Sequence, residues 1–410
     1  MYNAHMILRP ALTLLACSTL LDPAPAQELR TVDIERNGPS ANRVDVVVMG
    51  DGYQKEQQNQ FDDIARQVPK LFGHDPALGE YSRYFDFVRV NLVSKDDGIS
   101  GFGRNYDTAL GGHVTGNVKG DGQCGVDHGK VRAVLAQVEA SDGLAIVFVN
   151  KGTLGTGGGG IAVIGGRSDD TVIHEWGHAF AGLGDEYVRN SGHRSGVNAP
   201  NLSSTEDPKK VPWRAWIEAG APSIGVYEGA AGMQRGTFKP TTGGCVMENG
   251  KTYCRVCREA IVLAIHRHVD PIEKATPDVL TPLKLESSQV FEVTVMRPSS
   301  HALEVQWWLV PEASAPPAPK GPDRGGAQKT RDGRGPLAEI KKKPTARTPP
   351  DALGKAHWRL VPREQDVGRY ALICRVRDTT KLDGQELPWV LTDPRGLLES
   401  ERRWSIVVER

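Results

Sequence analysis

The 410-residue chain has no excess of charge of either sign, because 50 lysine and arginine residues balance 50 aspartate and glutamate residues. This balance argues against a nucleic-acid binder that works through a basic surface, and against an acidic solvating tail. The sequence also lacks any run of about 18 apolar residues, the length that a membrane-spanning helix needs. We therefore expect no nucleic-acid partner and no membrane span.

Aromatic residues are few, at 6% of the chain, but 39% of the residues are hydrophobic, which is enough to bury a core. Glycine is plentiful, with 46 residues, and predicts many loops and tight turns. At roughly 150 residues per domain, the length predicts two or three domains.

Residues 1–26 are predicted to be a signal peptide. Arg9 precedes a mostly apolar segment that is too short to span a bilayer, and Ala24-Pro25-Ala26 has the small-x-small pattern of a cleavage site. Leu14-Leu15-Ala16-Cys17 also resembles a bacterial lipoprotein box, in which Cys17 would carry a lipid anchor. Cleavage after Ala26 is the preferred interpretation. In both cases the protein is predicted to be exported, and to be periplasmic, secreted or on the cell surface, where disulfides are permitted.

Residues 27–284 have the pattern of a sheet covered by helices. Short apolar runs predict strands at 44–49, 87–93, 144–149 and 161–164. Helical spacing is found at 54–72, 131–140 and 259–268. Alternation of this kind predicts an α/β domain.

Beyond residue 284 the pattern consists of strands alone, at 289–296, 302–310, 358–361, 370–377 and 404–408. Asp366–Tyr370 resembles the turn before one strand of immunoglobulin-like sandwiches, and Tyr370, Leu372 and Cys374 share one face at period two. Residues 285–410 are therefore predicted to form an all-β immunoglobulin-like sandwich.

One segment of this second domain, 311–350, has an unusual composition. It holds nine of the 27 prolines, and nine lysines and arginines against four acidic residues. Such a segment buries too little apolar surface to fold, so it is predicted to be a disordered basic loop, with a binding arm as the alternative.

The segment from His174 to Asp185 carries the chemistry. On a helix with 3.6 residues per turn, His174 and His178 lie on one face, one turn apart, where two imidazoles can hold one zinc ion. Glu175 is rotated from His174 by about 100°, so its carboxylate can reach a zinc-bound water. This is the spacing of zinc peptidases, and it predicts zinc as the cofactor and Glu175 as the catalytic base.

Asp185 is the predicted third metal ligand. Gly182 suits the left-handed end of a helix, and Gly182-Leu183-Gly184-Asp185 places a carboxylate three residues later, where metzincins have their third ligand. The spacing from His178 is one residue longer than in that pattern, and the ligand is a carboxylate in place of histidine. Glu186 is the competing third ligand.

Further candidates lie downstream. Cys245-Val246-Met247-Glu248 resembles a Met-turn, a methionine beneath the metal site, and a core methionine is the alternative. A second group that polarises the substrate carbonyl is expected, and Tyr187 and Tyr253 are candidates, although each also suits a structural role.

These residues resemble the IgA-peptidase family of zinc metalloendopeptidases, a metzincin-like group. Val46–Tyr53 is similar to the family's opening strand and turn, His174–Tyr187 to its metal-binding stretch, and Cys245–Ala260 to a later block. The similarity covers roughly residues 44–265.

The resemblance implies that residues 27–284 form a zinc metallopeptidase domain with an α/β zincin (metzincin-like) fold. It implies endopeptidase action on protein or peptide substrates, with His174, His178 and Asp185 as zinc ligands and Glu175 as base. In such enzymes the strand at 161–164 is a sheet edge that binds substrate by strand addition; a flexible turn is the alternative. Cleavage of IgA itself is not implied, because substrate choice lies in the loops.

Two other function classes remain open. The first is an inactive zinc-binding adhesion module, which is disfavoured because Glu175 is not needed to bind metal. The second is a metal-dependent hydrolase of glycans, in which Trp307-Trp308 would stack on sugars, although these tryptophans also suit a core.

Five cysteines follow the signal peptide, and this odd number leaves at least one without an intramolecular partner. Cys374 is predicted to be a buried free thiol. Disulfides are predicted among Cys124, Cys245, Cys254 and Cys257. The alternative is a structural zinc site that uses Cys254 and Cys257 and needs two more ligands.

Overall fold

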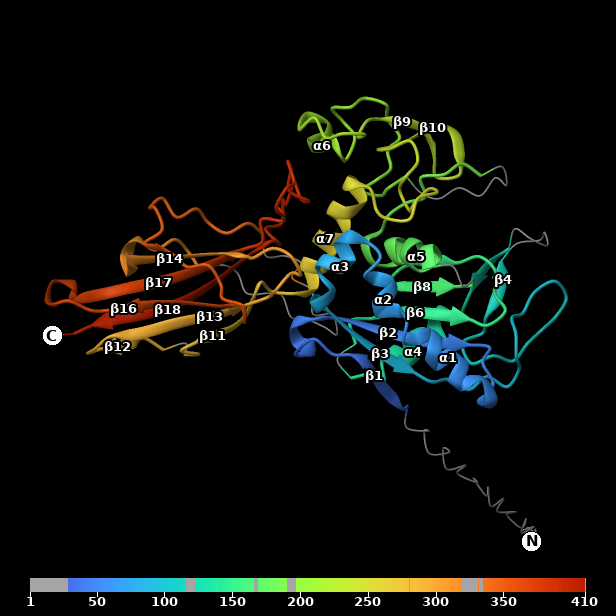
Figure 1. Ribbon diagram of the computed structural model, residues 1–410, viewed down its shortest axis with the longest axis horizontal. Coiled ribbons are helices and arrows are strands. Elements are labelled where there is room, and N and C mark those ends of the chain that lie inside the picture. The colour runs from blue at the N-terminus through green and yellow to red at the C-terminus, as the bar shows by residue number, and fades with distance from the viewer. Residues whose placement is uncertain are drawn as a thin grey trace, which may run out of the picture.

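The computed structural model describes residues 29–115, 122–139, 141–165, 169–189, 197–279, 281–318, 331 and 335–409. These residues form two bodies: a mixed sheet with its helices, on the right of Figure 1, and a β-rich C-terminal region on the left. The predicted signal peptide, including Cys17, lies outside the described residues. Within the described ranges, no helix combines the length and the apolar character that a bilayer crossing requires.

The N-terminal body is built on a six-stranded sheet with the order β1-β3-β2-β6-β8-β7. The parallel inner strands are β2 (Val44–Asp51), β3 (Phe85–Val90), β6 (Leu144–Val149) and β8 (Ile161–Ile164). The antiparallel edge strands are β1 (Thr31–Glu35) and β7 (Thr156–Gly158). The inner strands are buried along their whole length, which explains their continuous apolar sequences.

Helices cover both faces of this sheet (Figure 1). The core on one face includes α1 (Gln58–Ala65), α2 (Val68–Phe72), α3 (Pro76–Glu80), α5 (Asp169–Ala181) and α7 (Arg255–His268). The other face is covered by α4 (His128–Leu135). Alternate residues of β2 show the division, since Val46 and Val48 belong to the α5 side and Val47 and Met49 to the α4 side.

Shorter elements complete this body. Two antiparallel hairpins pair β4 (His113–Thr115) with β5 (Gln123–Gly125), and β9 (Tyr227–Ala230) with β10 (Met233–Lys239). The second hairpin and α6 (Arg214–Glu218) form the lobe at the top of Figure 1. The 3-10 helices among the described residues are η1 (Ser40–Asn42), η2 (Lys55–Gln57), η3 (Ser82–Tyr84), η4 (Glu312–Ser314) and η5 (Glu364–Asp366).

The C-terminal region consists of two sheets. One contains β11 (Ile272–Thr276), β13 (Gln289–Val295) and β16 (Lys355–Leu360). The other contains β12 (Leu283–Leu285), β18 (Glu399–Val408), β17 (Gly368–Arg377), β14 (Glu304–Pro311) and β15 (Ala346–Arg347). The sheets pack through aromatic rings, with Phe291 of β13 centred 5.2 Å from Trp404 of β18, and Trp307 of β14 centred 6.4 Å from Trp358 of β16.

This region differs from the sequence prediction in two places. Its first strand begins at Ile272, ahead of the predicted domain boundary at 285 and of the first predicted strand at 289–296, because β11 pairs with β13. The predicted disorder of 311–350 does not hold for residues 335–350, because their backbone bonds to β14: β15 pairs with that strand, and the Trp308 indole donates to the Lys342 carbonyl at 3.0 Å. Composition alone cannot reveal such edge pairing. Residues 319–330 and 332–334 lie outside the described ranges.

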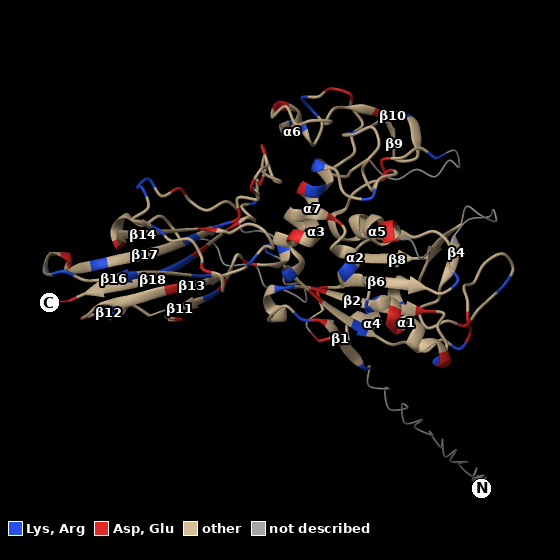
Figure 2. Ribbon diagram, in the orientation of Figure 1, with Lys and Arg blue, Asp and Glu red and all other residues tan. Residues whose placement is uncertain are grey.

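Buried polar contacts join the two bodies. His301 of the C-terminal region lies 2.7 Å from Glu80 through Nδ1 and 2.8 Å from Asp378 through Nε2. The Tyr81 hydroxyl donates to Asp378 at 2.8 Å, and His266 of α7 lies 3.3 Å from the same carboxylate. Charged residues of both signs are otherwise scattered over both bodies (Figure 2).

Candidate metal centre

Helix α5 presents two histidines because its sequence has one apolar face. Asp169 and Asp170 occupy its first turn, where carboxylates interact favourably with the helix dipole. Trp176 is fully buried, with its ring centred 5.2 Å from Phe72, and anchors the helix on the core. The helix ends at Ala181, and Gly182 adopts a φ of 64°, the left-handed conformation that its position predicted.

The turn after Gly182 brings three predicted residues together. Asp185 Oδ1 lies 3.2 Å from His174 Nε2 and 3.0 Å from His178 Nε2. The two Nε2 atoms are 3.1 Å apart. A tetrahedral ion with zinc–nitrogen distances of about 2.0–2.1 Å sets neighbouring ligand atoms about 3.3 Å apart. The three atoms therefore have the mutual spacing of ligands to one zinc ion.

Backbone carbonyls fix the tautomers of both histidines. His174 Nδ1 lies 2.8 Å from the Val246 carbonyl oxygen, and His178 Nδ1 lies 2.6 Å from that of Leu183. Because a carbonyl oxygen only accepts, each Nδ1 carries the hydrogen and each Nε2 lone pair faces the shared point. Ligating histidines in metal sites are held in this way, so the donor set fits a metal ion.

Asp185, and not Glu186, faces the histidines. Burial by itself raises the pKa of the Asp185 carboxyl, but its contacts with His174 and His178 outweigh burial and hold that pKa below its usual range. The neighbouring Glu186 is fully buried on the other side, where it accepts from Asn201 Nδ2 at 2.9 Å. Burial raises the pKa of Glu186 to about 8.

Glu175 lies beside the three atoms. Its side chain is largely buried, and one carboxylate oxygen lies within 4.8 Å of a ring nitrogen of each histidine. A β-carbon at Gly155 would lie 2.7 Å from Glu175 Oε1, so the chain before β7 packs directly on the carboxylate. Burial raises the pKa of Glu175, and His174 and His178 oppose that rise. The Glu175 carboxylate lies beside the point shared by His174, His178 and Asp185. It therefore suits contact with a metal-bound water molecule better than direct contact with the metal.

The two tyrosine candidates separate clearly. The Tyr187 ring stacks on the His174 ring with centroids 6.0 Å apart, and burial followed by the charge of Asp185 raises the Tyr187 pKa. Tyr253 is fully buried and its hydroxyl donates to the backbone carbonyl of Ile173, so it holds the helix from within the core. Only Tyr187 borders the site.

Met247 lies under the helix, as the Met-turn expectation requires. Its side chain is fully buried, and a β-carbon at Gly177 would lie 2.9 Å from its Sδ atom. Its carbonyl oxygen accepts from the Glu186 N–H at 2.8 Å. The same turn therefore supports the helix, the His174 ring through Val246, and the segment that bears Asp185.

The predicted sheet edge at 161–164 is wrong. Strand β8 is paired on both sides, in parallel with β6 and antiparallel with β7. The edge strand is β7, which the sequence analysis missed because Thr156-Gly157-Gly158 has no apolar pattern. Within the described residues the sheet ends at β7.

The predicted disulfides are absent as well, since each of the five cysteines in the described residues is free. Cys374 is buried, as predicted. Three cysteines that the sequence analysis considered for disulfides gather around Glu186, with one ligand atom from each residue within 4.8 Å of the others: Cys245, Cys254 and Cys257.

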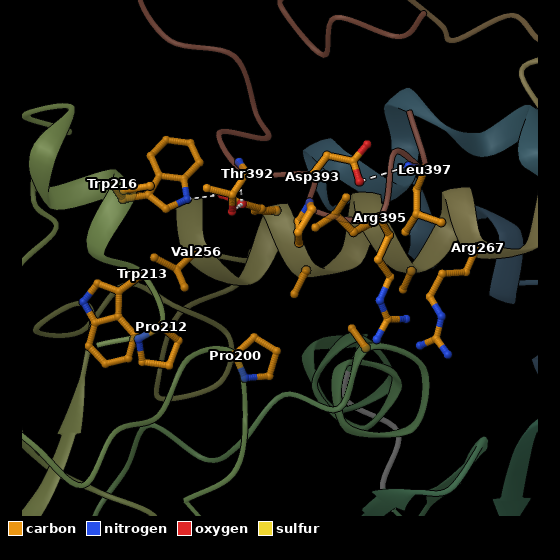
Figure 3. A pocket seen from close by; sticks show the side chains of 17 residues that line it. Pro200, Pro212, Trp213, Trp216, Val256, Arg267, Thr392, Asp393, Arg395 and Leu397 are labelled. Atoms are coloured by element: carbon orange, nitrogen blue, oxygen red, sulfur yellow. Dashed lines mark hydrogen bonds between the residues drawn. The ribbon is translucent and has the colours of Figure 1, made fainter. Parts of the chain in front are cut away.

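A cavity of about 300 Å³ lies beside α7, next to the C-terminal end of α5 (Figure 3). Trp213 and Trp216 stand at one end of it and Arg267 and Arg395 at the other. Ala181, the last residue of α5, lines it, but neither histidine, Glu175 nor the Asp185 carboxylate does. The cavity is therefore separate from the metal-binding geometry.

Comparison with known proteins adds one match. Residues 32–223 match the family model described as IgA Peptidase M64, a range that contains the six-stranded sheet except Thr31, as well as α5 and Asp185. No curated protein matches the chain.

Proposed function

Since the chain belongs, through residues 32–223, to an IgA-peptidase-type metallopeptidase family, we propose that it is an exported zinc-dependent endopeptidase acting on protein or peptide substrates. The observation that carries this proposal is the convergence of His174 Nε2, His178 Nε2 and Asp185 Oδ1 on one point, with Glu175 beside them. His174, His178 and Asp185 would hold the zinc ion.

Bound zinc supplies a Lewis acid that polarises the scissile carbonyl and eases deprotonation of water. Glu175 accepts the proton of the attacking water on its carboxylate and delivers it to the leaving amine nitrogen. The carbonyl carbon gains the hydroxyl, the C–N bond breaks, and the amine gains the proton. Tyr187, stacked on His174, borders the position of the substrate carbonyl.

Strand β7 is the proposed docking edge for the substrate backbone. A β-carbon at Gly157 would lie 2.8 Å from His178 Cβ, so this strand runs directly against the histidine-bearing helix. Gly158 has open space beside it. An extended peptide that pairs with β7 would pass the metal ligands, as in recognition by strand addition.

The finer fold assignments are also proposals. The antiparallel edge strand, the turn at Gly182 and Met247 beneath α5 support a metzincin-like catalytic domain. Two packed sheets with a tryptophan core support an immunoglobulin-like fold for the C-terminal region. Export, and a lipid at Cys17 as its alternative, are inferred from sequence alone.

The two other function classes are less consistent with these contacts. Trp307 is fully buried, and Trp308 is largely buried with its indole bonded to a backbone carbonyl, so neither offers a face to a sugar. An inactive zinc-binding module has no need for the buried Glu175 carboxylate next to the ligands.

The proposal is tested by incubating the purified protein with a broad peptide library and, separately, with glycans. Peptide cleavage that is lost on chelation and restored by added zinc supports it. Glycan release without peptide cleavage, or retained peptide cleavage after complete zinc removal, would refute it.

A further inference from the structure

Four potential ligand atoms meet at the second cluster, which consists of Glu186, Cys245, Cys254 and Cys257. All four atoms lie within 4.8 Å of one another. Cys245 Sγ is 3.7 Å from Cys257 Sγ, and Cys257 Sγ is 3.1 Å from Glu186 Oε1. Cys245, Cys257 and Glu186 have no exposed surface. We propose that this cluster is a second zinc site, with a structural role.

The sulfur spacing favours a metal over a disulfide. A tetrahedral zinc ion with zinc–sulfur distances of about 2.3 Å places two thiolates about 3.8 Å apart, close to the observed separation. A disulfide would use two of the three cysteines and leave one thiol and a buried carboxylate beside it. Three thiolates and a carboxylate complete a four-coordinate, closed site, the pattern of structural zinc. Soft thiolate ligands also select zinc over magnesium or calcium.

Neighbouring groups hold the proposed ligands in place. Cys254 is the N-cap of α7, and its N–H lies 3.4 Å from Cys245 Sγ, where the positive end of the helix favours thiolates. Glu186 accepts from Asn201 Nδ2 at 2.9 Å and from Thr241 Oγ1 at 3.2 Å. Such outer contacts orient ligands in metal sites.

Positive charge lies close to the cluster. Zinc with three thiolates and one carboxylate keeps a net charge of −2, since +2 is added to −4. Lys239 Nζ donates to the Glu186 carbonyl oxygen at 2.6 Å and also pairs with Glu248 at 2.5 Å. Its charge therefore offsets part of the negative charge of the site.

The location explains what the site would do. Its ligands come from three segments: the stretch after α5, the turn at Cys245 and the start of α7. Asp185 precedes Glu186, and Val246, whose carbonyl oxygen orients His174, follows Cys245. A zinc ion here would tie together the supports of the histidine site without touching substrate.

Metal content of the full chain gives the first test. We expect about two zinc ions per chain by elemental analysis of the purified protein. The His174→Ala/His178→Ala variant and the Cys254→Ser/Cys257→Ser variant should each keep about one. Cys374→Ala, which removes a buried cysteine of β17, is the matched control and should keep both. Loss of zinc only from the histidine variant would overturn the proposal.

Spectroscopy identifies the ligands directly. Cobalt exchanged into His174→Ala/His178→Ala should show a near-ultraviolet thiolate-to-metal band, which Cys254→Ser/Cys257→Ser should lack. If the cysteine variant fails to fold, X-ray absorption at the zinc edge of the unaltered protein decides: a sulfur shell at about 2.3 Å supports the site, and nitrogen and oxygen alone refute it. A mass lower by two hydrogens without reductant, which signals a disulfide among these cysteines, also refutes it.

This inference is independent of the proposed peptidase activity. A protein that keeps cysteine-bound zinc but cleaves no peptide would refute the function and support the second site. A protein that cleaves peptides but binds zinc through nitrogen and oxygen ligands only would support the function and refute the second site.

Discussion

Gly177 and Met247 are in direct contact between the two histidines of α5: a β-carbon at Gly177 would lie 2.9 Å from Met247 Sδ. The same β-carbon would lie 3.1 Å from side-chain atoms of Leu183 and Tyr253. The helix therefore approaches the Met247 turn as closely as its backbone allows. The absence of a side chain at position 177 sets how close His174 and His178 lie to that turn.

We predict that Gly177→Ala lowers the free energy of unfolding, although alanine usually stabilises a helix by about 1 kcal/mol relative to glycine. Overpacking a filled core costs about 1–3 kcal/mol, which exceeds that gain. Urea denaturation measures the change. A double-mutant cycle with Met247→Ala should show strong non-additivity. Additive effects would mean that the two residues do not constrain each other.

Glu175→Gln should keep zinc and lose activity by about 10²–10⁴-fold, because an amide cannot accept the proton of the attacking water. Steady-state cleavage of a peptide found in the library screen, together with zinc analysis, measures both properties. Glu218→Gln on α6 changes the same functional group at an exposed site, 64% exposed, and should leave turnover unchanged. Half of the normal turnover in Glu175→Gln would contradict its role as base.

Gly155→Ala should reduce kcat while zinc content stays constant. The added methyl carbon would lie 2.6–2.8 Å from the carboxylate end of Glu175, so the base must move, and a displacement of about 1 Å can cost 10²-fold. Gly129→Ala at the start of α4, on the opposite face of the sheet, is the control for replacing a glycine and should leave kcat unchanged. Equal kcat values for the two variants would show that the contact does not position Glu175.

The contact between the two bodies predicts a pH dependence. His301 is buried between Glu80 and Asp378, near Tyr81 and His266. Burial lowers the His301 pKa, but the two carboxylates outweigh burial and raise that pKa to about 9. A histidine pKa raised above about 6.5 stabilises the fold fully below pH 6.5 and loses that contribution as pH rises through 9.

The carboxylates act in the opposite direction. The pKa of Asp378 and that of Glu80 are held below their usual range, since hydrogen bonds from their histidine partners outweigh burial. Their contribution is complete above about pH 4–5 and disappears as pH falls further. Stability should therefore decline on both sides of about pH 5–7. Denaturation from pH 6 to 10 should show a shallower decline for His301→Gln, and an identical decline in both proteins would exclude His301 as the cause.

Local spacing predicted the part of the site that a single helix carries. His174, Glu175, His178 and the turn at Gly182 follow from the helical repeat and from the conformational freedom of glycine. The choice between Asp185 and Glu186 does not follow from local spacing, because it depends on contacts from distant segments, such as the one from Asn201.

Other features depend on pairing across long sequence separations. The edge position of β7 follows from its pairing with β8, which its glycines do not reveal. The start of the C-terminal region at Ile272 follows from pairing with β13. The cysteine cluster could not be predicted in full, because its fourth member, Glu186, lies far from the cysteines in the sequence. The sequence instead suggests Glu186 as an alternative third ligand at the histidine site.

Asp185 and Glu186 are consecutive, yet their side chains serve separate clusters on opposite sides of the backbone. The number of residues between Gly182 and these carboxylates is therefore fixed as strictly as their identity. Inserting or deleting one residue would shift Asp185 and Glu186 by one position along the backbone. Neither carboxylate would then reach its own cluster with the correct geometry. This connecting segment therefore tolerates changes in length as poorly as a buried helix or strand does. Substitutions that keep the number of residues should be tolerated, but an insertion or deletion would disrupt both clusters at once.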